Sequence, residues 1–379
     1  MNQPESDSPM VVLAMQGGGA LGAYQAGVFQ ALVEHDIQVD WVIGTSIGAF
    51  NGAIIAGNPP EKRLARLREF WHGIARDGPL EYPFPMVMPG LRPLITSAAM
   101  TDIFVNGVPG FFSPRKQLSW DPNAKVAPGE ASFYDTSELV KTLGHVIDFN
   151  YLKRASVRLT IGAVKVAGGE QALFDNTRDQ LTVHHVMASG ALPPGFPPVT
   201  VEGEMYWDGG VYSNTPIDVA LDDNERRDML CFSVDLWEPE HRLPTSIADV
   251  MNQEKNIRYA SRSREHLEDH ERMQNLRRAV RLLGERLSKA QLASPEVKDL
   301  LALGCGGRIN IVHLIQKELP GDNYLKDVDF RRATIDARWQ AGYADAQRVA
   351  RFKSWLNPLP PEVGLAIHEL PQLPGKDAA

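Results

Sequence analysis

Apolar and polar positions along the first 58 residues predict two units in which a strand is followed by a helix. The run Val11–Met15 (VVLAM) is short, rich in branched apolar residues and followed by glycines, which is typical of a buried strand. Apolar residues then recur at helical spacing from 20 to 34. A second strand is predicted at 40–43 and a second helix at 49–56. Alternation of this kind favours an α/β fold with a mainly parallel central sheet.

Later apolar runs predict further strands of the same sheet, at 157–166, 205–207, 230–236 and 308–315. A long helix is expected between the last two, over 254–289. Its leucines and valine repeat at helical spacing, so they lie on one face with arginines on the other; they are Leu276, Val280, Leu283 and Leu287.

The segment 79–122 breaks this pattern. Eight prolines are interleaved with aromatic residues and methionines, among them Phe104, Phe111 and Phe112, and this spacing is too broken for regular elements. We therefore expect a loop-rich excursion that forms a lid or a wall for an acyl chain, because exposed aromatics and methionines suit contact with lipid. A packed surface loop is the alternative.

Composition excludes several classes of protein. The chain has 379 residues, 43% of them hydrophobic and 23% charged, which is ordinary for a folded globular protein. A net charge of -8 and a pI near 5.7 give no reason to expect nucleic-acid binding. Only Cys231 and Cys305 are present, in no metal-binding pattern, and no apolar run approaches the ~18 residues of a spanning helix. We expect a cytoplasmic protein that is at most peripheral to a membrane.

We expect three parts of the chain: a flexible N-terminus at 1–10, a catalytic domain at 11–240, and a helical insertion with a final strand and an extension at 241–379. The helix at 254–289 carries ten Lys or Arg and six Asp or Glu. This excess suits either a solvated face or the approach to anionic headgroups.

A G-x-S-x-G motif occupies 44–48, between the second strand and the second helix. A sharp turn at this place exposes a serine hydroxyl above the sheet, so Ser46 is the candidate nucleophile. Gly44 and Gly48 leave room in the strained turn, where a side chain would crowd its neighbours. The alternative is a glycine-rich turn in which the serine only caps the helix.

A G-x-G-x-x-G motif occupies 17–22, after the first strand. A dinucleotide site would need an acidic residue at the far end of the second strand, whereas Asp40 precedes that strand. We favour an oxyanion hole, because consecutive glycines let backbone N–H groups converge at a helix N-terminus. Glycines that only allow tight packing are the alternative. The glycines of this turn are Gly17, Gly18, Gly19 and Gly22.

A serine nucleophile needs a base. The best candidate is Asp208, because it ends a predicted strand and the turn Gly209–Gly210 can direct its carboxylate toward Ser46. The rival is a Ser-Asp-His triad of the α/β-hydrolase type, with His313 as the histidine. A rival from another class is a non-catalytic nucleotide-binding protein that uses the first glycine turn for phosphate.

Together these segments resemble the patatin-like phospholipases. The resemblance covers residues 11 to about 240 and rests on the turns 17–22 and 44–48, on Ala188–Pro193 with Phe196–Pro198, and on Asp208–Gly210 followed by Asn214–Pro216. It implies a three-layer fold and a lipid acyl hydrolase with Ser46 as nucleophile, Asp208 as proton acceptor and the backbone of Gly18 and Gly19 as oxyanion donors. It implies no metal or organic cofactor.

Two details of the resemblance stand out. Many members of the family have Arg or Lys where this chain has Leu21, so the help that such a cation gives to the anionic intermediate is missing. The C-terminal part resembles the extension of a bacterial subgroup. The expected partner is a lipid or acyl ester, with peripheral membrane contact and without nucleic acid; the sequence leaves the oligomeric state open.

Overall fold

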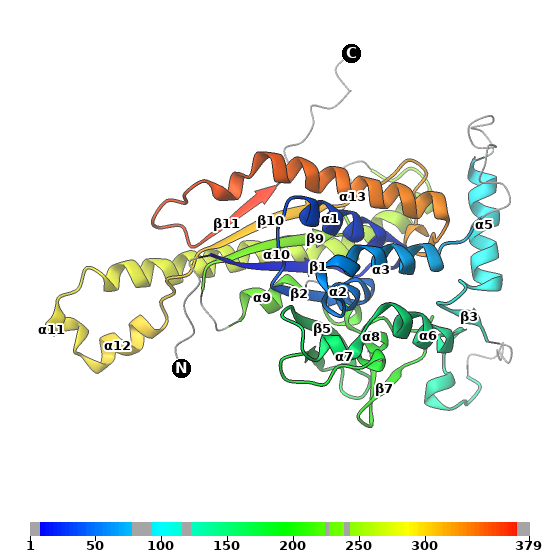
Figure 1. Cartoon of the computed structure of the whole chain (residues 1–379), viewed down its shortest axis with the longest axis horizontal. Helices are drawn as coiled ribbons and strands as arrows, with labels where there is room; N and C mark the ends of the chain where they lie inside the picture. The colour runs from blue at the N-terminus through cyan, green and yellow to red at the C-terminus, as the bar shows by residue number, and fades with distance from the viewer. Residues whose placement is uncertain are drawn as a thin grey trace, which may run out of the picture.

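The computed structural model describes residues 8–77, 92–115, 123–214, 216–223, 227–238 and 243–369, and a nine-stranded sheet lies at its centre (Figure 1). The strands of this sheet are β1 (Met10–Met15), β2 (Trp41–Thr45), β5 (Arg158–Lys165), β6 (Gln171–Asp175), β7 (Val199–Val201), β8 (Glu204–Asp208), β9 (Met229–Asp235), β10 (Ile309–Ile315) and β11 (Leu365–Glu369). A separate pair joins β3 (Ser113–Pro114) to β4 (Tyr134–Asp135).

Helices pack on both faces of the sheet, and others lie away from it (Figure 1). They are α1 (Ala23–Glu34), α2 (Ile47–Ala56), α3 (Pro60–Gly73), α5 (Arg92–Asn106), α6 (Ser137–Val146), α7 (Phe149–Leu152), α8 (Val183–Ser189), α9 (Ile217–Leu221), α10 (Ile247–Gly284), α11 (Lys289–Leu292), α12 (Pro295–Ala302) and α13 (Arg332–Phe352). Three short 3-10 turns matter for the site: η1 (Gly19–Gly22), η4 (Gly209–Val211) and η5 (Lys326–Val328).

The strand order is β11-β10-β9-β1-β2-β5-β8-β7. Strands β2 and β8 pair with successive parts of the same edge of β5, and β6 pairs with its other edge. All neighbours from β11 to β5 are parallel, whereas β6 and β8 run antiparallel to β5 and β7 runs antiparallel to β8. The mainly parallel sheet predicted from the sequence is therefore confirmed. The strand predicted at 308–315 pairs with β9 as β10, so residues on both sides of position 240 share one sheet. A domain boundary near 240 stays a prediction.

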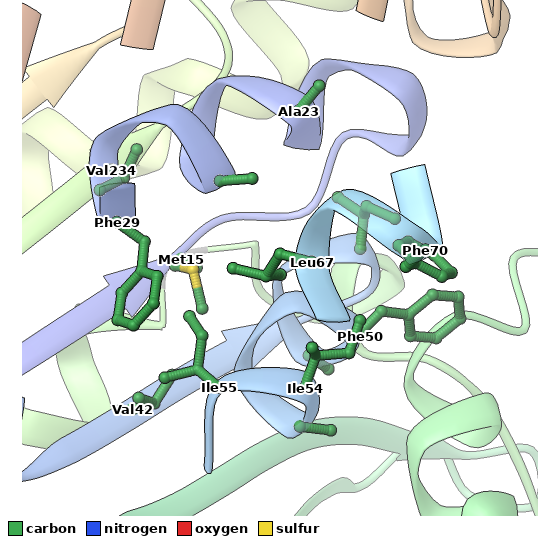
Figure 2. Packing of buried hydrophobic residues seen from close by; sticks show 14 of the residues in the cluster. Met15, Ala23, Phe29, Val42, Phe50, Ile54, Ile55, Leu67, Phe70 and Val234 are labelled. Atoms are coloured by element: carbon green, nitrogen blue, oxygen red, sulfur yellow. The ribbon is translucent and has the colours of Figure 1, made fainter. Parts of the chain in front are cut away.

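The sheet is the middle of three layers, as expected. Met15 and Val42 belong to one apolar cluster with α1, α2, α3 and α13, while Ala14 and Ile43 belong to another with α9 and Leu267 of α10. Adjacent residues of one strand point to opposite faces, which explains the division. In Figure 1, α10 runs behind the sheet while α1, α3 and α13 lie in front. Figure 2 shows the first cluster, with Met15, Phe29, Val42, Ile55 and Leu67 among the side chains that fill it.

Helices α1 and α13 touch backbone to backbone. A Cβ atom at Gly27 would lie 1.9 Å from the carbonyl oxygen of Trp339, and one at Gly342 would lie 2.0 Å from that of Tyr24. Only glycine permits such a close approach. Since α1 begins directly after η1, the C-terminal helix α13 supports the helix that follows the glycine turn.

The excursion at 79–122 differs in part from the expectation. Residues 78–91 and 116–122 lie outside the described residues, but α5 occupies 92–106 as a regular helix. Pro93 falls in its first turn, where a missing N–H costs little, and the helix then continues to Asn106 without another proline. The proline count of the whole segment hid this proline-free stretch.

The long predicted helix exists as α10, shifted toward the N-terminus. It packs through buried residues of mixed polarity, among them Asn252, Asn256 and Leu267. Leu276 and Leu283 of the predicted apolar stripe are 64% and 61% exposed, and Val280 and Leu287 are half-buried, so none of the four residues is part of the core. Across the described part of the chain, we find no helix with the length and apolar character needed to cross a membrane.

Candidate active site

Ser46 lies in a strained turn between β2 and α2. Its φ of 56° and ψ of -125° place it outside the regions that L-residues prefer. The turn closes tightly: a Cβ at Gly44 would lie 2.4 Å from backbone atoms of Gly48, and a Cβ at Gly48 would lie 2.1 Å from the carbonyl oxygen of Met15. Both glycines of the G-x-S-x-G motif therefore stand where a side chain has no space.

Ser46 and Asp208 meet because β2 and β8 share one edge of β5. Thr45 pairs with Gly162, and Asp208 pairs with the next residue, Ala163, while β6 occupies the opposite edge. Strand β2 is parallel to β5 and β8 is antiparallel to it, so the ends of β2 and β8 face each other. The two candidate residues, remote in sequence, become neighbours through this arrangement.

The carboxyl group of Asp208 is buried, with 2% of the residue exposed, and lies with Ser46 in the lining of one cavity. The N–H of Gly210 donates to the same carboxyl group over 2.8 Å. Burial raises the pKa of Asp208 to about 7, against the smaller lowering effects of the Ser46 side chain and the Gly210 N–H. A carboxyl group that titrates near neutral pH suits the transfer of a proton from a neighbouring hydroxyl group.

A second serine supports the turn. The Ser189 hydroxyl donates to the carbonyl oxygen of Gly162 over 2.6 Å and accepts the Ser46 N–H over 2.9 Å. A Cβ at Gly209 would lie 2.5 Å from that same carbonyl oxygen. The segments around 46, 189 and 209 therefore all converge on Gly162 of β5.

The glycine turn after β1 lies next to Ser46, since a Cβ at Gly17 would be 2.9 Å from the Ser46 Cβ. The Gly17 N–H donates to Asn214 Oδ1 over 2.8 Å, so it is already engaged. Gly19 has a φ of +55°, which favours glycine. Gly22 packs beneath the serine turn, where a Cβ would lie 2.6 Å from Ile47.

A cavity of about 420 Å³ opens beside these groups. Its polar lining includes Ser46, Asp208 and Asn214. Most of the remaining wall is apolar, and ten aromatic residues contribute to it: Phe50, Phe104, Phe111, Phe112, Phe133, Tyr134, Phe196, Trp237, Tyr259 and Phe330. Three of these rings belong to the excursion at 79–122, so its described part borders the candidate site, while its role as a lid or acyl-chain wall stays a prediction.

Several residues of the site escaped the sequence analysis. Asn214 binds both backbone groups of Gly17. Its Oδ1 accepts the Gly17 N–H, and its Nδ2 donates to the Gly17 carbonyl oxygen over 3.0 Å. Trp237 Nε1 donates to that oxygen as well, over 2.8 Å. Asn214 and the supporting Ser189 both stood in quoted motifs without a role, whereas Trp237 gave no signal of its own.

The groups proposed for the rival functions lie elsewhere. His313 pairs with the Asp235 carboxylate over 3.0 Å, and no histidine lines the cavity among the described residues. Asp40 accepts the Val11 N–H over 2.8 Å, at the start of β1 rather than near the glycine turn. Within the described ranges, no group of three or more His, Cys, Asp or Glu residues could hold a metal ion.

Comparison with known families shows which family the chain belongs to. Residues 13–221 match the family described as patatin-like phospholipase, and residues 257–362 match one described as patatin phospholipase. The first match covers more than half of the chain, and the chain therefore belongs to the patatin-like phospholipase family. The resemblance inferred from the motifs is confirmed, and the second match extends it into the C-terminal part. The bacterial subgroup of that part stays a prediction.

Curated relatives are much longer proteins. Lysophospholipase NTE1 of Eremothecium gossypii is 24% identical over 250 residues, which cover 63% of this chain and 13% of that protein. Patatin-like phospholipase domain-containing protein 6 of Mus musculus is 27% identical over 212 residues, 55% of this chain and 12% of the relative. The chain thus spans little more than a tenth of their length.

Solved structures give more distant similarities. VipD from Legionella pneumophila has a TM-score of 0.37 and 14% identity, covering 91% of this chain and 67% of VipD. The ExoU-SpcU complex from Pseudomonas aeruginosa has a TM-score of 0.28 and 20% identity, covering 78% of this chain and 59% of the matched chain.

Proposed function

We propose that this protein is a serine hydrolase that cleaves carboxylic ester bonds of lipids through a Ser46-Asp208 dyad. The observation that carries the proposal is the placement of Ser46 and the buried Asp208 carboxyl group side by side at an apolar cavity that both residues line. A nucleophile, a base and backbone donors in one place are the parts that acyl transfer needs.

The reaction follows from these positions. Ser46 Oγ attacks the ester carbonyl carbon while Asp208 accepts the hydroxyl proton. The negative charge that develops on the carbonyl oxygen is stabilised by backbone N–H groups of the glycine turn. We assign this role to Gly18 and Gly19, because the Gly17 N–H already donates to Asn214 and Gly22 supports Ile47.

The second half of the reaction returns the enzyme to its starting state. Asp208 gives its proton to the leaving alcohol, and the C–O bond of the ester breaks, which leaves the acyl group on Ser46. Water then attacks the acyl-enzyme while Asp208 accepts one of its protons. The fatty acid leaves, and Ser46 recovers its hydrogen. A pKa near 7 lets Asp208 serve in both directions at neutral pH.

The cavity wall favours a lipid substrate. Aromatic side chains bury large apolar areas, so a wall to which ten aromatic residues contribute suits an acyl chain better than a polar substrate. Phe104 and Phe133 line the cavity and are also 43% and 52% exposed. We place the peripheral contact with a lipid surface at this rim, because a chain leaving a bilayer meets these rings on its way to Ser46. The cytoplasmic location stays a prediction.

A fluorophosphonate probe tests the proposal, because it reacts with an activated serine. We expect labelling and hydrolysis of a short p-nitrophenyl ester by the natural protein and neither by Ser46→Ala. Labelling that persists in Ser46→Ala would refute the assignment of the nucleophile. A micromolar complex with NAD or FAD, measured by calorimetry, would instead support the nucleotide-binding alternative.

A further inference from the structure

The oxyanion turn rests on a part of the chain far from the catalytic motifs. A Cβ at Gly19 would lie 2.3 Å from the carbonyl oxygen of Asp327, in η5. The backbone of η5 is therefore in contact with the residue whose N–H we assign to the oxyanion. Any movement of η5 toward or away from the sheet changes the space available to Gly19.

Two consecutive residues of α10 hold two consecutive residues of η5. Lys255 Nζ donates to Asp327 Oδ1 over 2.6 Å and to the Tyr324 carbonyl oxygen over 3.1 Å. Asn256 Oδ1 accepts from Lys326 Nζ over 2.7 Å. The side chains of Lys255 and Asp327 are only 25% and 16% exposed, so solvent screens their attraction less than that of a surface pair.

Lys255 and Lys326 also lie near Trp237, which contacts the other end of the glycine turn. The ammonium groups of Lys255 and Lys326 lie 5.8 Å and 5.5 Å from the ring centre of Trp237, within the range of a cation-π interaction. Trp237 donates to the Gly17 carbonyl oxygen, as described above. The turn is therefore fixed at Gly17 by Trp237 and Asn214, and at Gly19 by η5.

From this geometry we infer that the Lys255-Asp327 ion pair positions the oxyanion donors. The pair sets the place of η5, and η5 sets the orientation of the peptides at Gly18 and Gly19. The inference rests on the proposed function and adds a role for the C-terminal part of the chain. Lys255 and Asp327 are positioning residues, because they act through the backbone of the turn.

Steady-state kinetics with a short soluble ester tests this role in Lys255→Met and Asp327→Asn. Misplacement of an oxyanion donor weakens binding of the transition state and leaves the ground state almost unchanged. We expect kcat to fall roughly 10-fold to 100-fold in each variant, with KM within about 2-fold of the natural value. In the double variant, kcat should fall no further than in the less active of the two single variants, because each single substitution already removes the same ion pair.

Two variants serve as controls. Lys255→Arg keeps the charge and restores most of kcat. Lys317→Met removes a different ion pair, between Lys317 and Glu238, and should leave kcat unchanged. If circular dichroism shows that neither charge-removing variant folds, Asp327→Glu becomes the test. This variant keeps the ion pair but has a side chain one methylene longer, so it displaces η5. A natural kcat in that variant would overturn the inference.

Other outcomes are equally clear. Natural kcat in Lys255→Met and Asp327→Asn would refute the positioning role. A raised KM with natural kcat would refute it too, since Asp327 lines the cavity and would then act by contacting the substrate. Failure of the proposed function gives a different result, which is full activity in Ser46→Ala.

Discussion

The two sides of the cavity are built by different means. On the polar side, the catalytic groups lie at strand ends and in turns, and a Cβ at Gly19, Gly44 or Gly48 would come within 2.4 Å of a neighbouring backbone atom. On the aromatic side, rings pack on rings, with centroids 5.2 Å apart for Phe112 and Phe196 and 5.5 Å apart for Phe111 and Phe330. Backbone contacts position the polar side, and side-chain contacts shape the aromatic side.

This difference predicts different tolerance to change. A tight backbone contact has no rotamer through which to relax, so an added atom displaces the turn. Apolar side chains can repack when volume is conserved, at a cost usually below about 1.5 kcal/mol. Substitutions on the polar side should therefore act on the chemical step, and those on the aromatic side on the choice of substrate.

The largest effect is expected from Asp208→Asn. The amide keeps the shape of the side chain but cannot accept the Ser46 proton, so kcat should fall by roughly 10² to 10⁴ in a spectrophotometric ester assay. Single substitutions of the histidines serve as controls and should keep most of the activity. A comparable loss in His313→Ala, with Asp208→Asn still active, would favour the triad.

Gly19→Ala should lower kcat by about 10² to 10³, since the new methyl group would meet the carbonyl oxygen of Asp327 and misdirect an oxyanion donor. The matched control is Gly73→Ala, because nothing lies within 4 Å of a Cβ at that position. Unchanged kcat in Gly19→Ala, together with a natural circular dichroism spectrum, would contradict the oxyanion assignment.

On the aromatic side, Phe104→Ser with Phe133→Ser should lower activity on a long-chain ester about 10-fold more than on a short soluble ester. Both rings line the cavity and are partly exposed, so their removal takes apolar contact from the chain at ~25 cal/mol per Å². Paired assays on the two esters measure the difference, and equal losses would refute a role in chain binding.

The deeper rings sharpen the same comparison. Phe111 and Phe112 are each only 5% exposed and pack against Phe196 and Phe330. Their replacement by Ser removes core packing as well as cavity wall, so the melting temperature should fall in addition to long-chain activity. Phe104 and Phe133 therefore separate lipid selection from stability more cleanly.

A separate prediction concerns stability rather than activity, and it again involves Asp208. Its pKa is near 7 in the folded protein and ~3.9 in an unfolded chain, so ionisation costs folding free energy as pH rises through this interval. The penalty is absent below the unfolded pKa and complete above pH 7, where it is on the order of 4 kcal/mol. Asp208→Asn should thus raise the melting temperature at pH 8 more than at pH 5. An equal shift at both values would contradict the raised pKa.

Local motifs account for most of what the sequence could predict. The turns at 17–22 and 44–48 each lie between a strand and a helix within one short segment, so glycine spacing in that context was enough to propose Ser46 as nucleophile and the first turn as an oxyanion hole. Asp208 needed only a strand end and a glycine turn. The order of apolar runs was enough to predict the mainly parallel sheet.

Long-range contacts account for what it could not. Asn214 and Trp237 reach Gly17 across 197 and 220 residues, and Lys255 reaches Asp327 across 72 residues. Nothing in the spacing around these residues indicates a partner so far away. The predicted apolar face of α10 is a further example, because Leu276 and Leu283 are exposed. Helical periodicity identifies an apolar face but does not indicate whether another element packs on it.

The central place of β1 has a consequence for synthesis of the chain. The turns around Gly19 and Ser46 and the base Asp208 have all been made by residue 210, yet one edge of β1 pairs with β9 at 229–235, and α1 packs against α13 at 332–352. A nascent chain that has left the ribosome only as far as 210 therefore exposes an unpaired strand edge and a bare helix face. Such edges invite aggregation. The order of synthesis thus delays completion of this arrangement until α13 has emerged.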